Sequence, residues 1–175
     1  MNALVRAATL TNFLEVAQDL GLNPLPLLRE VGLSRALLAE PEQRIPATSA
    51  VRLLETAAQA SGCAQFGLRM AESRQLSDFG VVSLLISHQR TLRDALSVTM
   101  QYRHLLNDTL AMQLEDAGDM VIIREEVVAT APSRQATELA LGVLFRMCAA
   151  VMGGRWAPRS VNFSHEAPAD LTLHK

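Results

Sequence analysis

In one stretch of this chain the spacing of apolar residues changes from that of a helix to that of a strand. This change limits the folds that the chain can adopt. Apolar residues recur at helical spacing over most of the chain, but between Leu110 and Val128 they alternate with polar residues. Leu110, Met112 and Leu114 share one face of that stretch, and the tetrapeptide Asp116–Asp119 is a turn signal. Successive side chains of a strand point to opposite faces, so two alternating runs joined by a turn predict an antiparallel β-hairpin.

Helices are predicted on both sides of the hairpin. Asn23 followed by Pro24 is the preferred order at a helix start, and Thr91 with Asp94 three residues later resembles a capping box. The predicted helical segments are 10–20, 24–31, 35–40, 46–60, 65–71, a helical hairpin over 79–106, and 133–152. We therefore expect an α+β fold that is mostly helical, with a small antiparallel hairpin or sheet packed against the helices.

Two finer expectations concern single segments. The run Gly80–Ser87 is strongly apolar, which predicts a buried helix. The run Ser160–Ser164 has the residue types of a short strand, which would add a third strand to the hairpin.

Composition excludes several classes of protein without naming a function. Apolar residues make up 49% of the 175 residues and charged residues 19%, which is typical of a globular domain. The net charge of −2 provides no basic field for nucleic acid. The longest uncharged run, Phe79–Gln89, is too short to span a membrane. Two cysteines cannot form a disulfide framework, so we expect a reducing cytosol.

The segment Asn12–Leu38 has the spacing of a helix-turn-helix but the wrong chemistry. A recognition helix must present several polar or basic side chains to DNA. Here the second helix carries Pro24, Pro26 and three leucines, and Arg29 is its one basic residue. We therefore favour a packed helical hairpin over a DNA-binding unit.

The residue spacing supports no catalytic or metal-binding constellation. Four histidines are spread along the chain, and none pairs with another His or Cys at helical spacing: His88, His104, His165 and His174. Cys148 lies in an apolar run, which favours inert packing. Glu125 and Glu126 are neighbours on a strand, so their side chains point to opposite faces. A small stand-alone enzyme and a haem or gas sensor with His104 as lone axial ligand stay open as alternatives.

The order of the motifs along the chain is the most specific feature of the sequence. In chain order they are Arg44–Ala47, Arg52–Ala58, Phe66–Arg69, Phe79–Gly80, Thr91–Leu96, Tyr102–Leu106, the hairpin, and Val161–Pro168. This order resembles the N-terminal effector-binding and dimerisation domain of AraC/XylS-type transcriptional regulators, in the arabinose-binding-type branch. The resemblance covers nearly the whole chain.

The resemblance implies one regulatory domain over residues 1–175, with a helical part over about 1–75 and an α+β part over about 76–175. It implies a small-molecule effector, not necessarily a sugar, and a homodimer in the cytoplasm with no membrane partner. DNA would be bound only by two helix-turn-helix motifs beyond Lys175, so we expect this chain to be part of a longer regulator.

No cofactor is predicted. The haem-based nitric-oxide sensor fold, whose element order is similar, pairs its proximal His with a Tyr-x-Ser-x-Arg motif. The comparable region here, Ala131–Arg134, lacks both the Tyr and the spacing.

Ligand contacts are predicted where the helical hairpin would pack on the β-hairpin and leave a concave seam. The six candidates are Phe79, Ser83, Ser87, Tyr102, Arg103 and Met112. Phe79 and Met112 would form apolar wall. Ser83 and Tyr102 would orient a ligand by hydrogen bonds, and Arg103 would pair with a carboxylate if the effector carries one.

Overall fold

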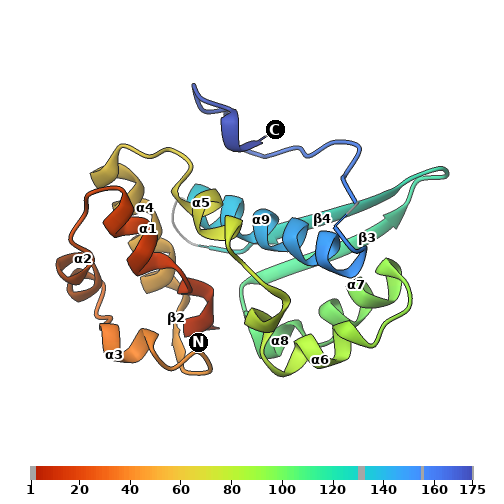
Figure 1. The fold of residues 1–175 in the computed structure, drawn as a ribbon, viewed down its shortest axis with the longest axis horizontal. Coiled ribbons are helices and arrows are strands. Elements are labelled where there is room, and N and C mark those ends of the chain that lie inside the picture. The colour runs from red at the N-terminus through yellow and green to blue at the C-terminus, as the bar shows by residue number, and fades with distance from the viewer. Residues whose placement is uncertain (1–2, 130–132, 155, 175) are drawn as a thin grey trace.

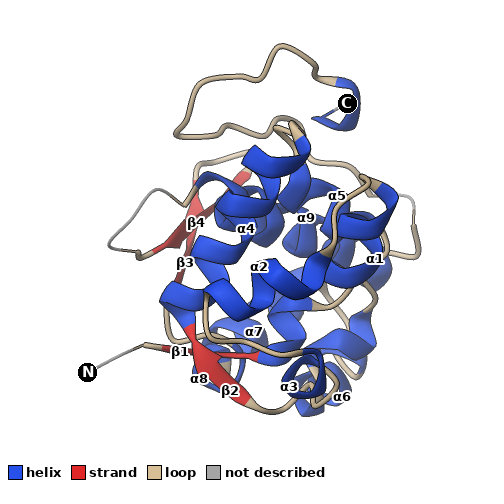
Figure 2. Ribbon diagram, turned by 90° about the vertical axis from the view of Figure 1, so that its left-hand side faces the viewer, coloured by secondary structure: helices blue, strands red, loops and turns tan. Residues whose placement is uncertain are grey.

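The computed structural model describes residues 3–129, 133–154 and 156–174. Helices make up most of these residues, and two small antiparallel sheets lie at separate places among them (Figure 2). The α+β fold predicted from the sequence is confirmed. Within the described ranges, no helix is long and apolar enough to cross a membrane.

The first half of the chain is built around its longest helix, α4. In chain order the elements are β1 (Leu4–Arg6), η1 (Ala7–Leu10), α1 (Phe13–Asp19), α2 (Pro24–Glu30), α3 (Arg35–Leu38), β2 (Arg44–Pro46), α4 (Ala47–Ser61) and α5 (Phe66–Glu72). α4 begins directly after Pro46 and is closed by Gly62, whose φ of 68° is the left-handed conformation that glycine adopts without strain. β1 and β2 pair antiparallel, with Val5 opposite Ile45.

A first hydrophobic cluster fills this half. The rings of Phe13 and Phe66 are fully buried, with centroids 5.8 Å apart. Leu53 and Leu54 of α4 and Met70 of α5 pack in the same cluster. Burying side chains of this size contributes about 1.5–3 kcal/mol each, so this cluster stabilises the helical half.

The second half combines short helices with the predicted hairpin. Its elements are η2 (Leu76–Phe79), α6 (Val81–Ser87), α7 (Leu92–Gln101), α8 (Arg103–Leu106), β3 (Leu110–Asp116), β4 (Val121–Val127), α9 (Arg134–Val151) and η3 (Thr172–His174). Thr91 caps α7, because its hydroxyl oxygen accepts from the Asp94 amide at 3.1 Å. A second hydrophobic cluster forms here around Val82, Ile86, Leu96 and Met147.

Helix α9 belongs to both clusters and lies between the first helices and the hairpin (Figure 1). It contributes Leu139 to the first cluster and Met147 to the second. α5 lies against it at very short range, because a Cβ on Gly67 would overlap the Gln135 carbonyl and a Cβ on Gly142 would overlap the Ala71 methyl. Pro132, predicted to lead into this helix, lies outside the described residues.

The prediction of helices alone before the hairpin is wrong for β1 and β2. Each strand has three residues, which is too short to show an alternating pattern. The two strands are held by pairing with each other, a long-range contact that the local sequence does not reveal.

The predicted third strand at Ser160–Ser164 is also wrong, because this segment forms no ladder with the hairpin. The chain after α9 is linked instead to that helix and to the residue that precedes α5. The Phe163 ring lies 5.1 Å from the His165 ring and 5.4 Å from the His174 ring, and the Gln65 side chain donates to the Asp170 carbonyl.

The expectation that the whole run Gly80–Ser87 is buried is wrong as well. Val82 and Ile86 of α6 are buried, whereas Val81 is 60% exposed and Leu84 62% exposed. α6 packs through one face only, so an all-apolar helix leaves its other face uncovered.

Candidate functional site

A cavity of about 130 Å³ lies between the two hydrophobic clusters. Its walls come from β1, η1, α4, the start of the second half, α7, α8, both strands of the hairpin and α9. An apolar cavity of about 150 Å³ in another protein holds a benzene molecule. The cavity therefore has room for a small organic molecule of about that size.

The lining is mostly apolar, which is usual for a small-molecule site. The apolar lining includes Val5, Val51, Leu54, Phe79, Leu106, Met112, Val127, Leu139, Val143, Leu144 and Met147. Several polar lining groups already have partners. The Thr99 hydroxyl donates to the Ala95 carbonyl at 2.9 Å, and the Thr109 hydroxyl donates to the Asn107 side chain at 2.7 Å.

Glu125 is the polar lining residue without such a partner. It sits on the inward face of β4 with Ile123 and Val127, directly opposite Met112. Its Oε2 atom is buried and accepts no hydrogen bond from any described residue. Burial raises the pKa of this carboxyl group to about 8. Among the described residues, Glu125 thus places in the cavity a carboxyl group with one buried oxygen that has no partner.

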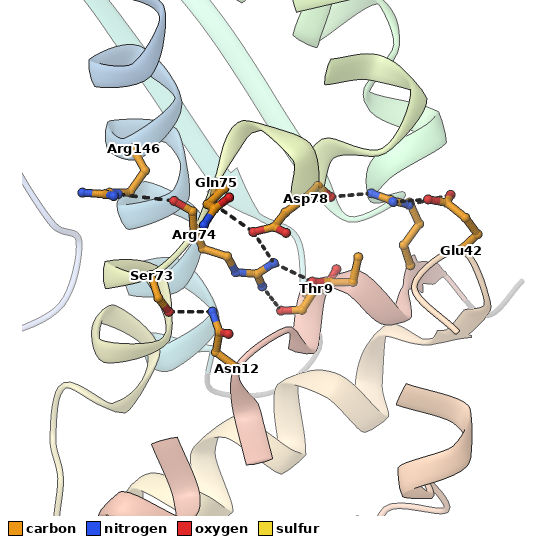
Figure 3. Close-up of polar contacts among 10 residues, drawn as sticks. Thr9, Asn12, Glu42, Ser73, Arg74, Gln75, Asp78 and Arg146 are labelled. Atoms are coloured by element: carbon orange, nitrogen blue, oxygen red, sulfur yellow. Dashed lines mark hydrogen bonds and ion pairs between the residues drawn. The ribbon is translucent and has the colours of Figure 1, made fainter. Parts of the chain in front are cut away.

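A buried guanidinium closes the cavity at the junction of η1 and η2 (Figure 3). Arg74 donates to the Ala8 carbonyl at 2.6 Å and to the Thr9 carbonyl, and its Nη1 lies 3.9 Å from the Asp78 carboxylate. Burial lowers the pKa of Arg74 to about 10, so the group stays charged at neutral pH. Its charge is matched by Asp78 and by the two carbonyls.

Arg6 on β1 makes a second link of the same kind (Figure 3). Its guanidinium binds both carboxylate oxygens of Glu42 and donates to the Asp78 carbonyl at 2.9 Å. The Arg6 hydrogen bond lowers the pKa of Glu42. Arg6 and Arg74 therefore tie the first half of the chain to η2, and among the described residues neither forms an ion pair with Glu125.

The structure brings three of the six predicted ligand contacts to the cavity wall: Phe79, Arg103 and Met112. Arg103 is exposed and donates to the Met100 carbonyl at 3.2 Å. The other three lie outside the lining. Ser83 donates to the Gly80 carbonyl at 2.6 Å and Ser87 to the Leu84 carbonyl at 3.0 Å, while Tyr102 packs against the second cluster.

Sequence reasoning missed Glu125 as a cavity residue. It treated this carboxylate only as a possible catalytic partner of Glu126, which is exposed on the opposite face of β4. A signal was present, because Glu125 interrupts the apolar inward positions of a strand. Arg74 gave no signal, since it lies between two helices without periodicity.

A separate polar cluster lies near the start of α9. Glu138 is fully buried and pairs with Arg134 at 3.3 Å, and the Nε2 atoms of His165 and His174 lie 3.4 and 3.7 Å from its Oε1. No group of metal-binding side chains meets the geometry of a metal site among the described residues. The cluster fastens the segment after α9 to the helix itself.

Cys148, considered as a nucleophile, and His104, considered as a haem ligand, lie apart from the cavity lining. Cys148 is buried, and desolvation, reinforced by the charge of Glu125, raises the pKa of its thiol to about 12. A thiol with that pKa is not a nucleophile at neutral pH. His104 is exposed on α8, and its ring lies 6.5 Å from that of Tyr102.

Comparison with known proteins identifies the class to which this cavity belongs. Residues 21–175 match the model of the arabinose-binding domain found at the N-terminus of AraC transcription regulators. The chain belongs to this family. Members are transcription regulator domains rather than enzymes, so the resemblance noted from the order of motifs is confirmed.

Two curated relatives place the AraC-type domain in a longer protein. The chain is 25% identical over 169 residues to the HTH-type transcriptional regulator VirS of Mycobacterium tuberculosis, in strain CDC 1551 / Oshkosh and equally in strain ATCC 25618 / H37Rv. The match covers 94% of this chain and 50% of each relative. The chain thus spans about half the length of the curated relatives it matches.

Proposed function

We propose that this AraC-type domain senses a small organic molecule, which it binds in the cavity between the two hydrophobic clusters. The observation that carries the proposal is the cavity itself, with its mostly apolar walls and, among the described residues, a carboxyl group without a partner. Apolar pockets with a few polar groups are the usual form of small-molecule sites.

The position of the cavity supports a regulatory role. Leu54 of the first cluster and Met147 of the second both line it, so an occupant contacts both clusters at once. A ligand shifts a conformational equilibrium only if it binds one arrangement better than another. A molecule held between the two clusters favours the arrangement in which both contact it.

The remaining parts of the proposal extend to the whole regulator. Residues 1–175 act as one regulatory domain without catalytic activity, in the cytoplasm, and DNA is bound by helix-turn-helix motifs outside this chain. Homodimerisation is part of the same proposal, because paired half-sites on DNA suit a two-fold protein. VirS is an HTH-type transcriptional regulator, and this chain spans about half of its length, which supports this division.

The test is a thermal-shift screen of small organic molecules on the 175-residue chain and on two variants. Ala140→Leu adds three carbon atoms to a residue that lines the cavity, whereas Ala150→Leu adds them to an exposed position of the same helix. We expect a stabilising compound to lose its effect on Ala140→Leu and to keep it on Ala150→Leu. A compound that stabilises all three proteins equally would place the ligand elsewhere.

The predicted contacts outside the lining receive their own test. Ser83→Ala and Tyr102→Phe weaken the response to a stabilising compound if the cavity extends toward α6 when it is occupied. An unchanged response removes these residues, and Ser87 with them, from the site.

A further inference from the structure

We propose that the molecule this cavity accepts carries a protonated amine, which pairs with Glu125 while its apolar body fills the remaining space. This inference rests on the proposed function and specifies the chemical class of the ligand. It is drawn from the placement of one unpartnered carboxyl group, among the described residues, in a mostly apolar lining.

The Glu125 carboxyl group lies at an inward position of β4 where an apolar side chain would be expected. β4 presents Ile123, Glu125 and Val127 to the interior, so an apolar residue would pack at the central position. A buried polar atom without a partner costs about 1–3 kcal/mol, and more when it is charged. The Oε2 atom of Glu125 is such an atom. A ligand that supplies a donor would remove that cost.

The other charged and titratable groups near the cavity come from several elements, and none of those described pairs with Glu125. On β1, Arg6 is bound to Glu42, and at η2 Arg74 is bound to Asp78 and to backbone carbonyls. At α8, Arg103 is exposed and donates to a carbonyl. The thiol of Cys148 on α9, behind Glu125, stays neutral at ordinary pH. No cation among the described residues is therefore paired with Glu125.

Three kinds of ligand group can be compared for this site. A ligand carboxylate would bring a second unpaired charge into the cavity, and the ionised form of Glu125 would repel it. A hydroxyl would satisfy the hydrogen bond of the neutral acid but would give the ionised form no counter-ion. An ammonium group supplies both, and charge-assisted hydrogen bonds are about twice as strong as neutral ones. A cavity of about 130 Å³ limits the apolar part to roughly a single ring.

Proton release distinguishes this mode of binding from simple cavity filling. Burial raises the pKa of Glu125 to about 8, so at pH 7 the empty site holds mostly the neutral acid. An ammonium ligand binds the carboxylate form, and the acid gives up one proton to solvent for each ligand bound. Affinity for such a ligand rises about tenfold between pH 6 and pH 7 and levels off above pH 8.

The experiment compares three probes of one shape, namely benzylamine, benzyl alcohol and benzoate, on the 175-residue chain at millimolar concentration. We expect benzylamine to raise the melting temperature most and benzoate least. Calorimetry at pH 7 in buffers of different ionisation enthalpy should show nearly one proton released per benzylamine. Glu125→Gln should abolish the preference for the amine and the proton release while keeping the response to benzyl alcohol.

Glu126→Gln is the matched control, because Glu126 is exposed on the opposite face of the same strand. It should behave as wild type with all three probes. A benzylamine effect that is equal in wild type and Glu125→Gln overturns the inference. Stabilisation by benzyl alcohol without any preference for benzylamine also overturns the inference of an amine ligand. That outcome is still consistent with the proposal that the cavity binds a small molecule. No response to any probe removes both proposals.

Discussion

Met112 on β3 and Glu125 on β4 are direct partners across the hairpin, and both line the cavity. The register of the hairpin therefore decides the chemistry of the site. A shift of one residue would turn Glu125 to the outer face and bring an exposed neighbour inward. The pairing also places an adaptable thioether beside the carboxyl group, which suits a wall that must accept different shapes.

Glu125 makes the stability of the domain depend on pH. Its pKa is about 8 in the folded state, against an ordinary value of 4.5. The folded protein keeps a proton that the unfolded chain releases above pH 4.5. The free energy of unfolding therefore falls as the pH rises from 4.5 to 8, and this group adds no further change above pH 8. We expect Glu125→Gln to be more stable than wild type at pH 8 by on the order of a few kcal/mol, with a smaller gap at pH 5. Urea unfolding at both pH values measures the gap, and an equal gap at both would contradict the assignment.

Arg74 holds the two halves of the chain together at the edge of the cavity. Arg74→Met should lower the free energy of unfolding by about 2–4 kcal/mol, because it removes the donor to the carbonyls of Ala8 and Thr9 and the cationic partner of the Asp78 carboxylate. Arg90→Ala, at an exposed position, serves as the control and should change little. Similar urea midpoints for both variants would show that the buried guanidinium is dispensable.

The contact between α5 and α9 predicts a graded response to alanine. In an open helix, Gly→Ala stabilises by up to about 1 kcal/mol. Gly67→Ala should destabilise instead, because its new methyl meets the backbone carbonyl of Gln135. Gly142→Ala should cost less, because its methyl would lie 2.5 Å from the Ala71 Cβ, against 2.0 Å from a backbone oxygen for Gly67→Ala, and the Leu68 side chain can shift. Thermal unfolding would rank the variants, and the reverse order would show that the helices separate easily.

The two histidines around Glu138 anchor the segment after α9. Replacing both His165 and His174 with alanine should speed cleavage within residues 156–174 by a nonspecific protease, since the ring contacts and the approach to Glu138 are lost. Limited proteolysis followed by mass spectrometry locates the cuts. His88→Ala, at an exposed position on another helix, should leave the cleavage rate unchanged.

Residues 1–175 alone should not bind DNA with sequence specificity. Lysine and arginine contacts to phosphate supply much of the affinity for DNA, and this chain has a net charge of −2. A mobility-shift assay on promoter DNA at physiological salt tests this expectation. A specific shift that survives competitor DNA would overturn the division of labour proposed for the regulator.

Local chemistry made most helix boundaries predictable from the sequence. Asn23, Ser34 and Thr91 each accept a backbone amide at the start of a helix, and Gly62 closes α4. The hairpin followed from its alternation. What depends on distant contacts was not predictable, such as the pairing of β1 with β2 and the approach of His165 and His174 to Glu138.

The candidate site was predictable in part for the same reason. Phe79, Arg103 and Met112 line the cavity because they lie on elements whose packing follows from the order of helices and strands, and their role as ligand contacts stays a prediction. Glu125 and Arg74 acquire their roles only when α4, α7 and α9 surround them. Their importance comes from the loss of hydration when the two side chains are buried, and the sequence pattern does not show which side chains lose it.

The close seating of Gly67 and Gly142 also has a mechanical consequence. Two helices in such close contact cannot slide or rotate on each other without a steric clash. We therefore expect α5 and α9 to move as one rigid unit. If a bound molecule changes the shape of the cavity, we expect the movement in other elements that line it, namely β1, η2 and the hairpin. In the proposed response to a ligand, these elements would move against the fixed contact between α5 and α9.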